Sequence, residues 1–541
     1  MRPARLSHPD AAVRQNPDKD PKETDWCAVV EEQPQQREDR EPAGTARRFV
    51  FPSALTVLAV VTVAVWIVAF FIPSGTYDRG PDGSPLQGTY HHEPARGGFV
   101  HRLGQLFLAP VNGLYGVRDL KTGEVAPDAV GTLYGSAGVF LFVLAIGAFI
   151  TVVFATGALD RGIERLAHRL RERGALLIAG VMTVFSLLGT VEGFAEETLG
   201  FYGLLVPLML ALGYDRMVAT GTIILGAGIG VLASTVNPFA TGVASSAAGI
   251  SLGDGIALRF AMWLVLTAVT IAYVVRYARR VRANPARSLV GFREGDRELA
   301  EQAVHPPELT GLQKGVLVLV ALVFAFMIFS VIPWASALSG KADATPYGWE
   351  LGWGFAQLAA LFIVAAVLVG LVARLGEQKL SATIVQGVAD FVAPALVIVL
   401  ARGITVIMTN AKIIDTVLHA IEGTVRGTPE ALFGVMVFVV NLPLAFLIPS
   451  TSGHATLAMP ILAPLAEFAG VARALVVTAW QSASGWMNLW VPTTAVVVGG
   501  VSLAKVGYDR YLRFVWPLLV ILAVLVCAFV AVGAVVGSGG G

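Results

Sequence analysis

The sequence predicts an all-α polytopic membrane protein, built as an inverted repeat with two re-entrant hairpins and two broken helices. Three observations predict this fold class. Hydrophobic residues make up 55% of the 541 residues and charged residues only 14%, whereas soluble domains carry about 25% charged residues. Several apolar runs exceed the roughly 18 residues expected of a membrane-spanning helix. The two halves of the chain also repeat the same order of apolar and polar segments.

The composition excludes several other classes of protein. A net charge of +1 offers no basic surface for nucleic acid. Two cysteines, Cys27 and Cys527, cannot build a disulfide framework or a cysteine-rich metal site. The chain has no phosphate-binding G-x-x-x-x-G-K-[ST] loop, so ATP-driven transport would need a separate subunit. We therefore expect no cofactor and no metal, apart from a coupling Na⁺ or H⁺.

The N-terminal region predicts the orientation of the chain. Residues 1–48 mix both charge signs with Pro and Gln and show no periodicity, which is typical of a disordered cytoplasmic tail. The first span, at about 49–72, follows Arg47 and Arg48, so the N-terminus is expected in the cytoplasm. A second span at about 135–159 leads into an arginine-rich amphipathic segment, 160–173, which fits a helix in the cytoplasmic interface.

The rest of the first repeat, residues 49–277, contains two segments of unusual length. The segment 175–213 has two apolar flanks of about 15 residues around a polar middle, and each flank reaches roughly 23 Å against a hydrocarbon core of about 30 Å. It is better explained as a re-entrant hairpin than as a span. The segment 217–250 would reach roughly 51 Å as one helix, and Pro238 predicts that it is broken. A further span follows at 256–276.

The second repeat, residues 352–536, is predicted to follow a cytoplasmic loop and a linking span within 278–334. It contains spans at about 352–373, 388–410 and 512–536, a second hairpin at 431–470 and a second broken helix at 472–500 around Pro492. Each predicted hairpin enters and leaves the membrane on the same side. When the spans are counted in this way, the two halves of the chain have opposite orientations in the membrane. Inverted repeats with discontinuous helices are typical of secondary transporters.

Polar residues at the helix breaks and hairpin tips predict one shared site near the middle of the membrane, because unwound backbone is tolerated there only in a protein interior or a water-filled cavity. Freed carbonyl groups suit a cation such as Na⁺, and helix N-termini suit an anionic substrate group. The alternative is that both breaks are kinks that are satisfied locally. The candidate binding residues at the breaks are Ser234, Thr235, Asn237, Ser484, Asn488 and Thr493.

Charged and titratable residues at membrane depth are further candidates. Glu192, Glu196 and Glu197 at the first tip are candidates for coupling or gating, unless that tip reaches interfacial water. His454 at the second tip could carry a proton, or it could be a neutral hydrogen-bonding residue. Arg402, inside the span 388–410, must face an anion, which is either a substrate carboxylate or a tip glutamate.

Three runs of residues resemble a known family: Gly193-Phe-Ala-Glu-Glu-Thr198, the run 226–242 that contains Ser-Thr-Val-Asn-Pro, and Ile448-Pro-Ser-Thr-Ser-Gly453. They resemble the YfcC-like branch of the C4-dicarboxylate anaerobic carrier family, and the resemblance extends over residues 50–536. The family is grouped with the ion transporter superfamily. The resemblance implies an elevator-type architecture, in which a scaffold holds a homodimer while hairpins and broken helices carry the substrate.

The resemblance also assigns residues and leaves the cargo open. Ser234, Thr235, Asn237 and Pro238 match the first binding motif, and Pro449, Ser450, Ser452 and Gly453 match the second hairpin tip. Trp486 and Trp490, which flank Asn488, depart from the family pattern. Members of this branch are described either as dicarboxylate carriers or as amino-acid antiporters.

We therefore expect a secondary active transporter in the plasma membrane that moves a small carboxylate or an amino acid, coupled to Na⁺ or H⁺ or working by exchange. Its expected partners are the small-molecule substrate, the lipid bilayer and a second copy of the chain. A passive channel for small organic anions is the first alternative. An intramembrane enzyme is the second, but it would need a nucleophile or metal cluster at membrane depth, and the sequence offers no His or Asp cluster for one.

Overall fold

The structure is a computed structural model. It describes residues 54–538 except 80–84, 87, 96, 121, 171–172, 302–307, 340–343, 426, 448–450 and 493. The predicted tail 1–48 and the candidate residues Pro449, Ser450 and Thr493 lie outside the described residues.

Seven helices in the described part of the chain are long and apolar enough to cross a membrane. They are Ala137–Ala155, Gly174–Val191, Ile256–Ala283, Gly311–Val331, Phe355–Val372, Glu377–Asn410 and Tyr508–Val536. The last of these exposes Val524, Val532 and Val536, as expected of a helix that faces lipid. The chain is a multi-pass, mostly helical membrane protein.

The first part of the chain combines helices with short strands. Its elements are α2 (Ala54–Val68), β1 (Gly75–Thr76), β2 (His91–His92), α3 (Phe99–Tyr115), β3 (Val117–Asp119), β4 (Val125–Ala126), β5 (Gly131–Leu133), α4 (Ala137–Ala155) and α5 (Ala158–Arg169). Strands β1 and β2 pair antiparallel, and β3 lies between β4 and β5 in a second antiparallel sheet.

The next elements cover the segments in which a hairpin and a broken helix were expected. They are α6 (Gly174–Val191), η1 (Glu196–Phe201), α7 (Tyr202–Ala211), α8 (Arg216–Leu232), η2 (Pro238–Gly242), α9 (Val243–Ala248) and α10 (Ile256–Ala283). The carboxylate of Asp215 accepts the Val218 N–H at 2.9 Å and starts α8. Pro238 lacks an N–H, and the π-type turn η2 begins at this residue after α8 has ended.

The connection to the second half contains η3 (Pro285–Arg287), α11 (Asp296–Glu301), α12 (Gly311–Val331), α13 (Trp334–Ser339) and α14 (Phe355–Val372). Thr310 and Gln313 form a capping box that starts α12.

The second half gives a similar order of elements. It contains α15 (Glu377–Asn410), α16 (Ile414–Val425), α17 (Glu430–Leu447), α18 (Thr451–Phe468), α19 (Arg473–Asn488), α20 (Ala495–Leu503) and α21 (Tyr508–Ser538). Helix α15 starts earlier than the predicted span 388–410. Its first turns are polar and continue directly into the apolar part of the same helix.

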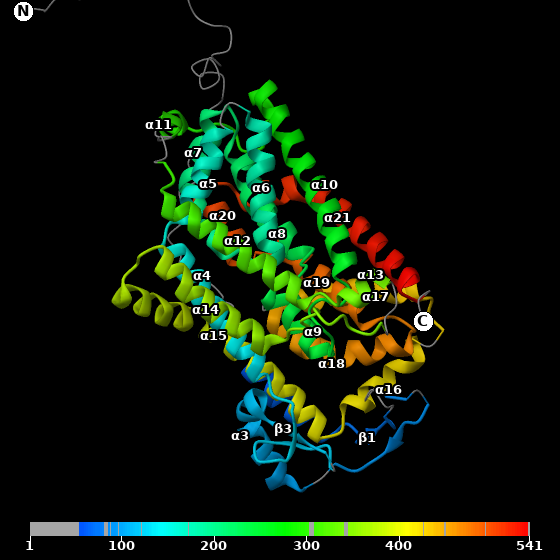
Figure 1. Cartoon of the computed structure of the whole chain (residues 1–541). Coiled ribbons are helices and arrows are strands. Elements are labelled where there is room, and N and C mark those ends of the chain that lie inside the picture. Colours follow the sequence, from blue (N-terminus) through cyan, green and yellow to red (C-terminus); the bar gives the residue numbers. More distant parts are fainter. Residues whose placement is uncertain are drawn as a thin grey trace, which may run out of the picture.

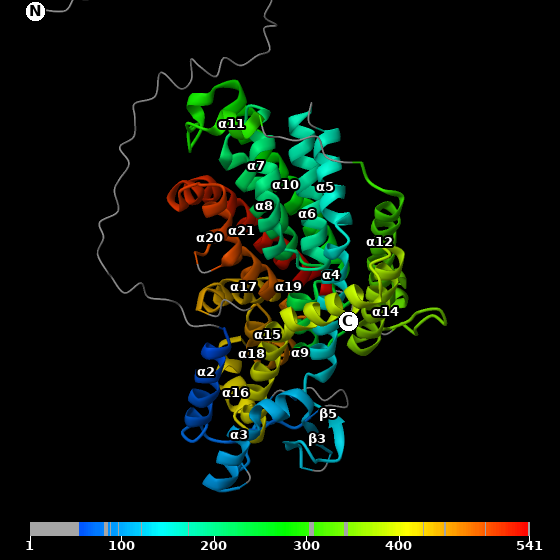
Figure 2. The same ribbon diagram turned by 90° about the vertical axis from the view of Figure 1, so that its left-hand side faces the viewer.

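The two largest hydrophobic clusters among the described residues involve different sets of helices. The larger one contains buried residues of α6, α8, α10, α19 and α21, among them Phe185, Ile224 and Trp480. The second lies between α4, α12 and α14, where the rings of Phe149, Phe324 and Phe362 pack together. Both views show α11 at one end of the molecule and α3 with the strands at the opposite end (Figures 1 and 2).

Candidate functional site

The tip between α6 and α7 is bound to the first helix break. Thr190 at the end of α6 donates to the carbonyl of Ala233 at 2.9 Å, and Thr235 donates to the carbonyl of Thr190 at 3.1 Å. Gly193 has a φ of +90°, and a Cβ there would lie 2.8 Å from the Asn237 amide. A side chain at position 193 would therefore push the tip away from the break.

The backbone of the first break is satisfied from within the chain. The Asn237 carboxamide oxygen accepts the N–H of Phe239 at 2.9 Å, and Thr241 donates to the carbonyl of Ser234 at 3.3 Å. The carbonyl of Thr235 accepts Nε of Arg259 at 3.1 Å. Arg259 is fully buried at the start of α10, and its guanidinium therefore places a positive charge at the break.

The second break lies beside the second tip. Ser484 and Asn488, in the last turns of α19, lie within 3.4 and 3.5 Å of the Thr451 hydroxyl, respectively. Thr451 is the first residue of α18. Helix α19 ends at Asn488 and α20 begins at Ala495, so the interruption lies within the segment 472–500, in which a broken helix was expected.

Helices α8 and α19 cross closely and bring the two breaks together. Gly485 lies against α8, where an added Cβ would be 2.3 Å from the Leu232 Cα. The Gln481 amide of α19 donates to the carbonyl of Val231 at 2.5 Å. The crossing therefore places the end of α8 beside the last turns of α19.

The two tips and the two breaks enclose a cavity of about 470 Å³, which we call the tip cavity. Five of the candidate residues line it: Glu196, Glu197, Asn237, Ser452 and Asn488. Asp390 of α15 adds a third carboxylate. Among the described residues that line this cavity, none is a lysine or arginine. The tip cavity therefore presents negative charge to a ligand.

Other candidates lie close to the tip cavity without lining it. Ser234, Thr235, Pro238, Gly453 and Ser484 belong to the same tips and breaks. The side chain of Glu192, at the end of α6, is buried.

His454 is also buried, and its Nε2 lies 3.0 Å from the Asn441 carboxamide oxygen. The Asn441 amide nitrogen already donates to Val437, so its oxygen accepts and His454 Nε2 carries the proton. Nδ1 of His454 is buried without a hydrogen-bond partner. This arrangement suits a neutral histidine.

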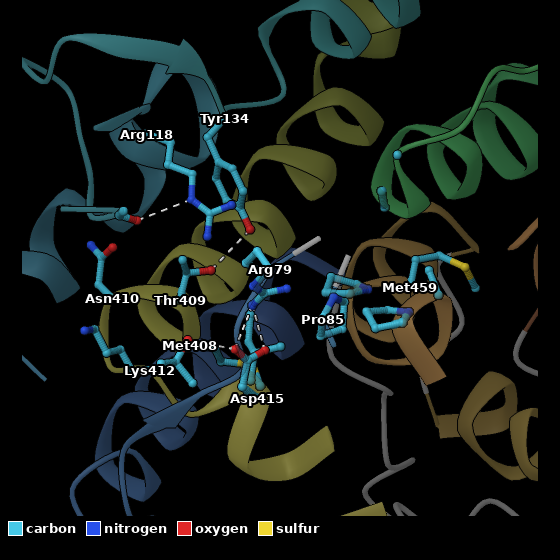
Figure 3. A pocket seen from close by; sticks show the side chains of 18 of the residues that line it. Arg79, Pro85, Arg118, Tyr134, Met408, Thr409, Asn410, Lys412, Asp415 and Met459 are labelled. Atoms are coloured by element: carbon cyan, nitrogen blue, oxygen red, sulfur yellow. Dashed lines mark hydrogen bonds and ion pairs between the residues drawn. The ribbon is translucent and has the colours of Figure 1, made fainter. Parts of the chain in front are cut away.

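A second cavity, of about 600 Å³, lies on the side of the strands and is called the strand-side cavity (Figure 3). Its walls come from β3, the end of α15, α9 and the middle of α18. Arg402 lines this cavity and not the tip cavity. Within the described residues, no ion pair joins Arg402 to a tip glutamate.

Helices α15 and α18 separate the two cavities. The tip cavity contacts Pro394 of α15 and Ser452 of α18, whereas the strand-side cavity contacts Arg402 of α15 and Met459 of α18. The two helices pack against each other, and Thr405 donates across this contact to the carbonyl of Thr456 at 3.2 Å. The molecule therefore has two cavities on either side of a closed helix–helix contact.

Sequence reasoning missed several residues at these cavities. Asp390 lies just inside the predicted span 388–410, and an acidic residue in that position was a usable signal. Thr451 stood inside the quoted tip motif. Arg259 carried a weaker signal, as a lone charge near the start of a predicted span. Tyr134 and Arg118 lie in a loop of more than 60 residues, where no local pattern indicates a site.

The fold matches that of solved membrane transporters. MtrF from Neisseria gonorrhoeae, described together with a class of antimetabolite efflux pumps, has a TM-score of 0.64 and 14% identity, covering 90% of this chain and 96% of its own. The YdaH transporter of Alcanivorax borkumensis has a TM-score of 0.64 and 13% identity, covering 89% and 98%. At this level of identity the likeness concerns the fold.

The family of the chain defines it as a membrane transporter. A family model described as "C4-dicarboxylate anaerobic carrier" matches residues 51–535, and the chain belongs to this family. An uncharacterized protein of Haemophilus influenzae is 30% identical over 510 residues, covering 87% of this chain and 95% of its own. An Escherichia coli protein named "Putative basic amino acid antiporter YfcC" is 27% identical over 514 residues, covering 90% and 97%. The predicted resemblance is confirmed.

Proposed function

We propose that the protein is a secondary active transporter of small amino acids that carry a positive charge, and that the tip cavity is its substrate site. One observation carries the proposal: three carboxylates and no described basic side chain line the tip cavity. Carboxylates at membrane depth are costly unless they meet a positive charge. A cationic substrate supplies that charge, whereas a dicarboxylate would be repelled. The name of the Escherichia coli relative supports the same class of cargo.

We propose exchange as the mode of coupling, with H⁺ coupling as the alternative. The carbonyls of Ala233, Ser234 and Thr235 at the first break already accept hydrogen bonds from within the chain. The Arg259 guanidinium lies where a Na⁺ ion was expected, and a second positive charge beside it would be unfavourable. Replacing all Na⁺ by choline is therefore expected to leave transport unchanged in liposomes that contain unlabelled substrate.

The proposed transport cycle is alternating access of the elevator type. In this cycle the hairpins and broken helices move together, because their tips and breaks are hydrogen-bonded to one another. Helices α4, α12 and α14 would belong to the scaffold, and a homodimer in the plasma membrane remains our prediction. The arginines at the end of the molecule where α11 lies favour a cytoplasmic location for that end, and we propose the same location for the N-terminus. No enzymatic activity is part of this proposal.

Counterflow in proteoliposomes tests the cargo. Liposomes loaded with unlabelled L-arginine should accumulate labelled L-arginine, and lysine and ornithine should compete more strongly than succinate or malate. Glu197→Gln should lower the arginine counterflow by roughly tenfold or more, since a hydrogen bond to a charged group contributes about 1.5–3 kcal/mol. Glu377→Gln, an exposed site at the start of α15, is the matched control and should behave as wild type.

Two results would contradict the proposal. One is counterflow of succinate without counterflow of any cationic amino acid, which would make the protein a dicarboxylate carrier. The other is an unchanged arginine counterflow in Glu197→Gln, which would remove this carboxylate from the substrate site.

A further inference from the structure

The charges in the strand-side cavity are unequally matched. Its described acidic side chains are all engaged: Asp415 accepts Arg79 at 2.7 and 2.9 Å, Glu93 pairs with Lys412, and Glu124 accepts Gln105 at 3.0 Å. Asp415 and Glu93 are thus paired with basic side chains of the same wall, whereas Glu124 is bonded to a neutral amide.

Two arginines in the same wall have no such partner. Arg402 has no ion pair among the described residues, and its Nε is buried without a hydrogen bond. Arg118 makes one long bond, of 3.4 Å, to the carbonyl of Gly123. Five basic and three acidic side chains line the cavity, which therefore carries an excess of positive charge.

An aromatic ring orients both guanidinium groups. The Cζ atoms of Arg402 and Arg118 lie 5.0 and 5.5 Å from the centre of the Tyr134 ring. The Tyr134 hydroxyl lies 3.2 Å from the Thr409 hydroxyl, which fixes the ring against α15, as Figure 3 shows. A stacked guanidinium keeps its N–H edge free, and this planar fork matches the two oxygens of a carboxylate.

We propose that Arg402, with Arg118 and Tyr134, forms a carboxylate-binding subsite in the strand-side cavity. The assignment of its ligand rests on the proposed function: the ligand is the α-carboxylate of the transported amino acid. The contact between α15 and α18 separates the two cavities, so the strand-side subsite holds the carboxylate while the substrate enters or leaves, before or after it occupies the tip cavity. A free carboxylate anion has the same chemistry and serves as a probe.

A thiol-protection assay tests the subsite without requiring transport. Met408 lines the strand-side cavity, and Met408→Cys in a Cys27→Ser/Cys527→Ala background gives one reporter thiol there. The protein in nanodiscs reacts with the neutral reagent methyl methanethiosulfonate in the presence of acetate, L-arginine, argininamide or chloride at constant ionic strength. Acetate and L-arginine should slow the reaction, whereas argininamide, which lacks a carboxylate, and chloride should not.

Variants of the arginines decide whether Arg402 holds the carboxylate. Arg402→Gln should raise the acetate concentration for half-protection by roughly tenfold or more, since a charge-assisted hydrogen bond contributes about 1.5–3 kcal/mol. Arg402→Lys keeps the charge but loses the fork, so its protection should be intermediate. Arg473→Gln is the matched control, because Arg473 already binds Glu467 and the carbonyl of Ala248, and it should retain protection.

Three results would overturn the subsite: equal protection in Arg402→Gln and wild type, equal protection by chloride and acetate, or a thiol at position 408 that does not react at all. The outcome is separable from that of the proposed function. Loss of arginine counterflow with intact acetate protection contradicts the cargo and leaves the subsite. Intact counterflow with protection that does not depend on Arg402 contradicts the subsite alone.

Discussion

Gly485 is the residue on which the crossing of α8 and α19 depends most directly. An added Cβ would meet the Leu232 backbone at 2.3 Å, and backbone cannot move aside as a flexible side chain can. Overpacking of this kind costs about 1–3 kcal/mol. Gly485→Ala should therefore lower the thermal unfolding temperature in detergent and reduce transport.

Gly203 provides the matched control for this prediction. It lies in α7 with no atom within 4 Å of its added Cβ, so Gly203→Ala should be neutral or stabilising by up to about 1 kcal/mol. Equal unfolding temperatures for the two variants would mean that α8 and α19 can move apart without loss of stability.

Single residues also show what the sequence could predict. The glutamates and Asn237 were found because charged and amide groups stand out in apolar runs. Arg402 was found for the same reason, but its neighbours were not predictable: its stacking partner Tyr134 is 268 positions away along the chain. Only the fold determines which cavity such a side chain faces.

At the scale of elements, a buried ion pair ties the segment around α11 to the start of α8. Arg216 donates to Asp296 from Nε and Nη2, at 2.9 and 2.6 Å, and from Nη1 to the carbonyl of Ala504 at 3.1 Å. The side chains are 6% and 2% exposed. Asp296→Asn would leave a buried arginine without its counter-charge, which costs about 3–5 kcal/mol.

This prediction is measured by thermal unfolding and by limited proteolysis of residues 284–301, which should become faster in Asp296→Asn. Asp509→Asn is the control, because Asp509 and Arg513 form an exposed pair at 4.0 Å that contributes less than about 1 kcal/mol. Equal effects of the two substitutions would show that α11 is held by other contacts.

The sequence indicated where long apolar segments would be interrupted. The segments 175–213 and 217–250 were singled out by their length, and 431–470 and 472–500 by the polar residues in their middle. In 175–213, 217–250 and 472–500 one helix ends and another begins, and in 431–470 the described helices are α17 and α18. The polar loop after α10 has no such feature in its sequence. Its ion pair joins Arg216 and Asp296, which are 80 positions apart, so the packing of this loop could not be predicted from the sequence.

At the scale of the whole molecule, the two cavities and the closed contact between them support alternating access. The family and the membrane-spanning character followed from composition and motifs. The separation into a tip cavity rich in carboxylates and a strand-side cavity rich in arginines did not, because it depends on how α15 and α18 pack.

The most direct test of this account is labelling of single cysteines from each face of the membrane. In the background without Cys27 and Cys527, Ala495→Cys reports on the tip cavity and Met408→Cys on the strand-side cavity. A membrane-impermeant maleimide is applied to intact cells and to inverted vesicles. We predict that the two positions react from opposite faces, and that unlabelled L-arginine changes both rates. Reaction of both positions from the same face, or of each position equally from both faces as in an open channel, would contradict alternating access.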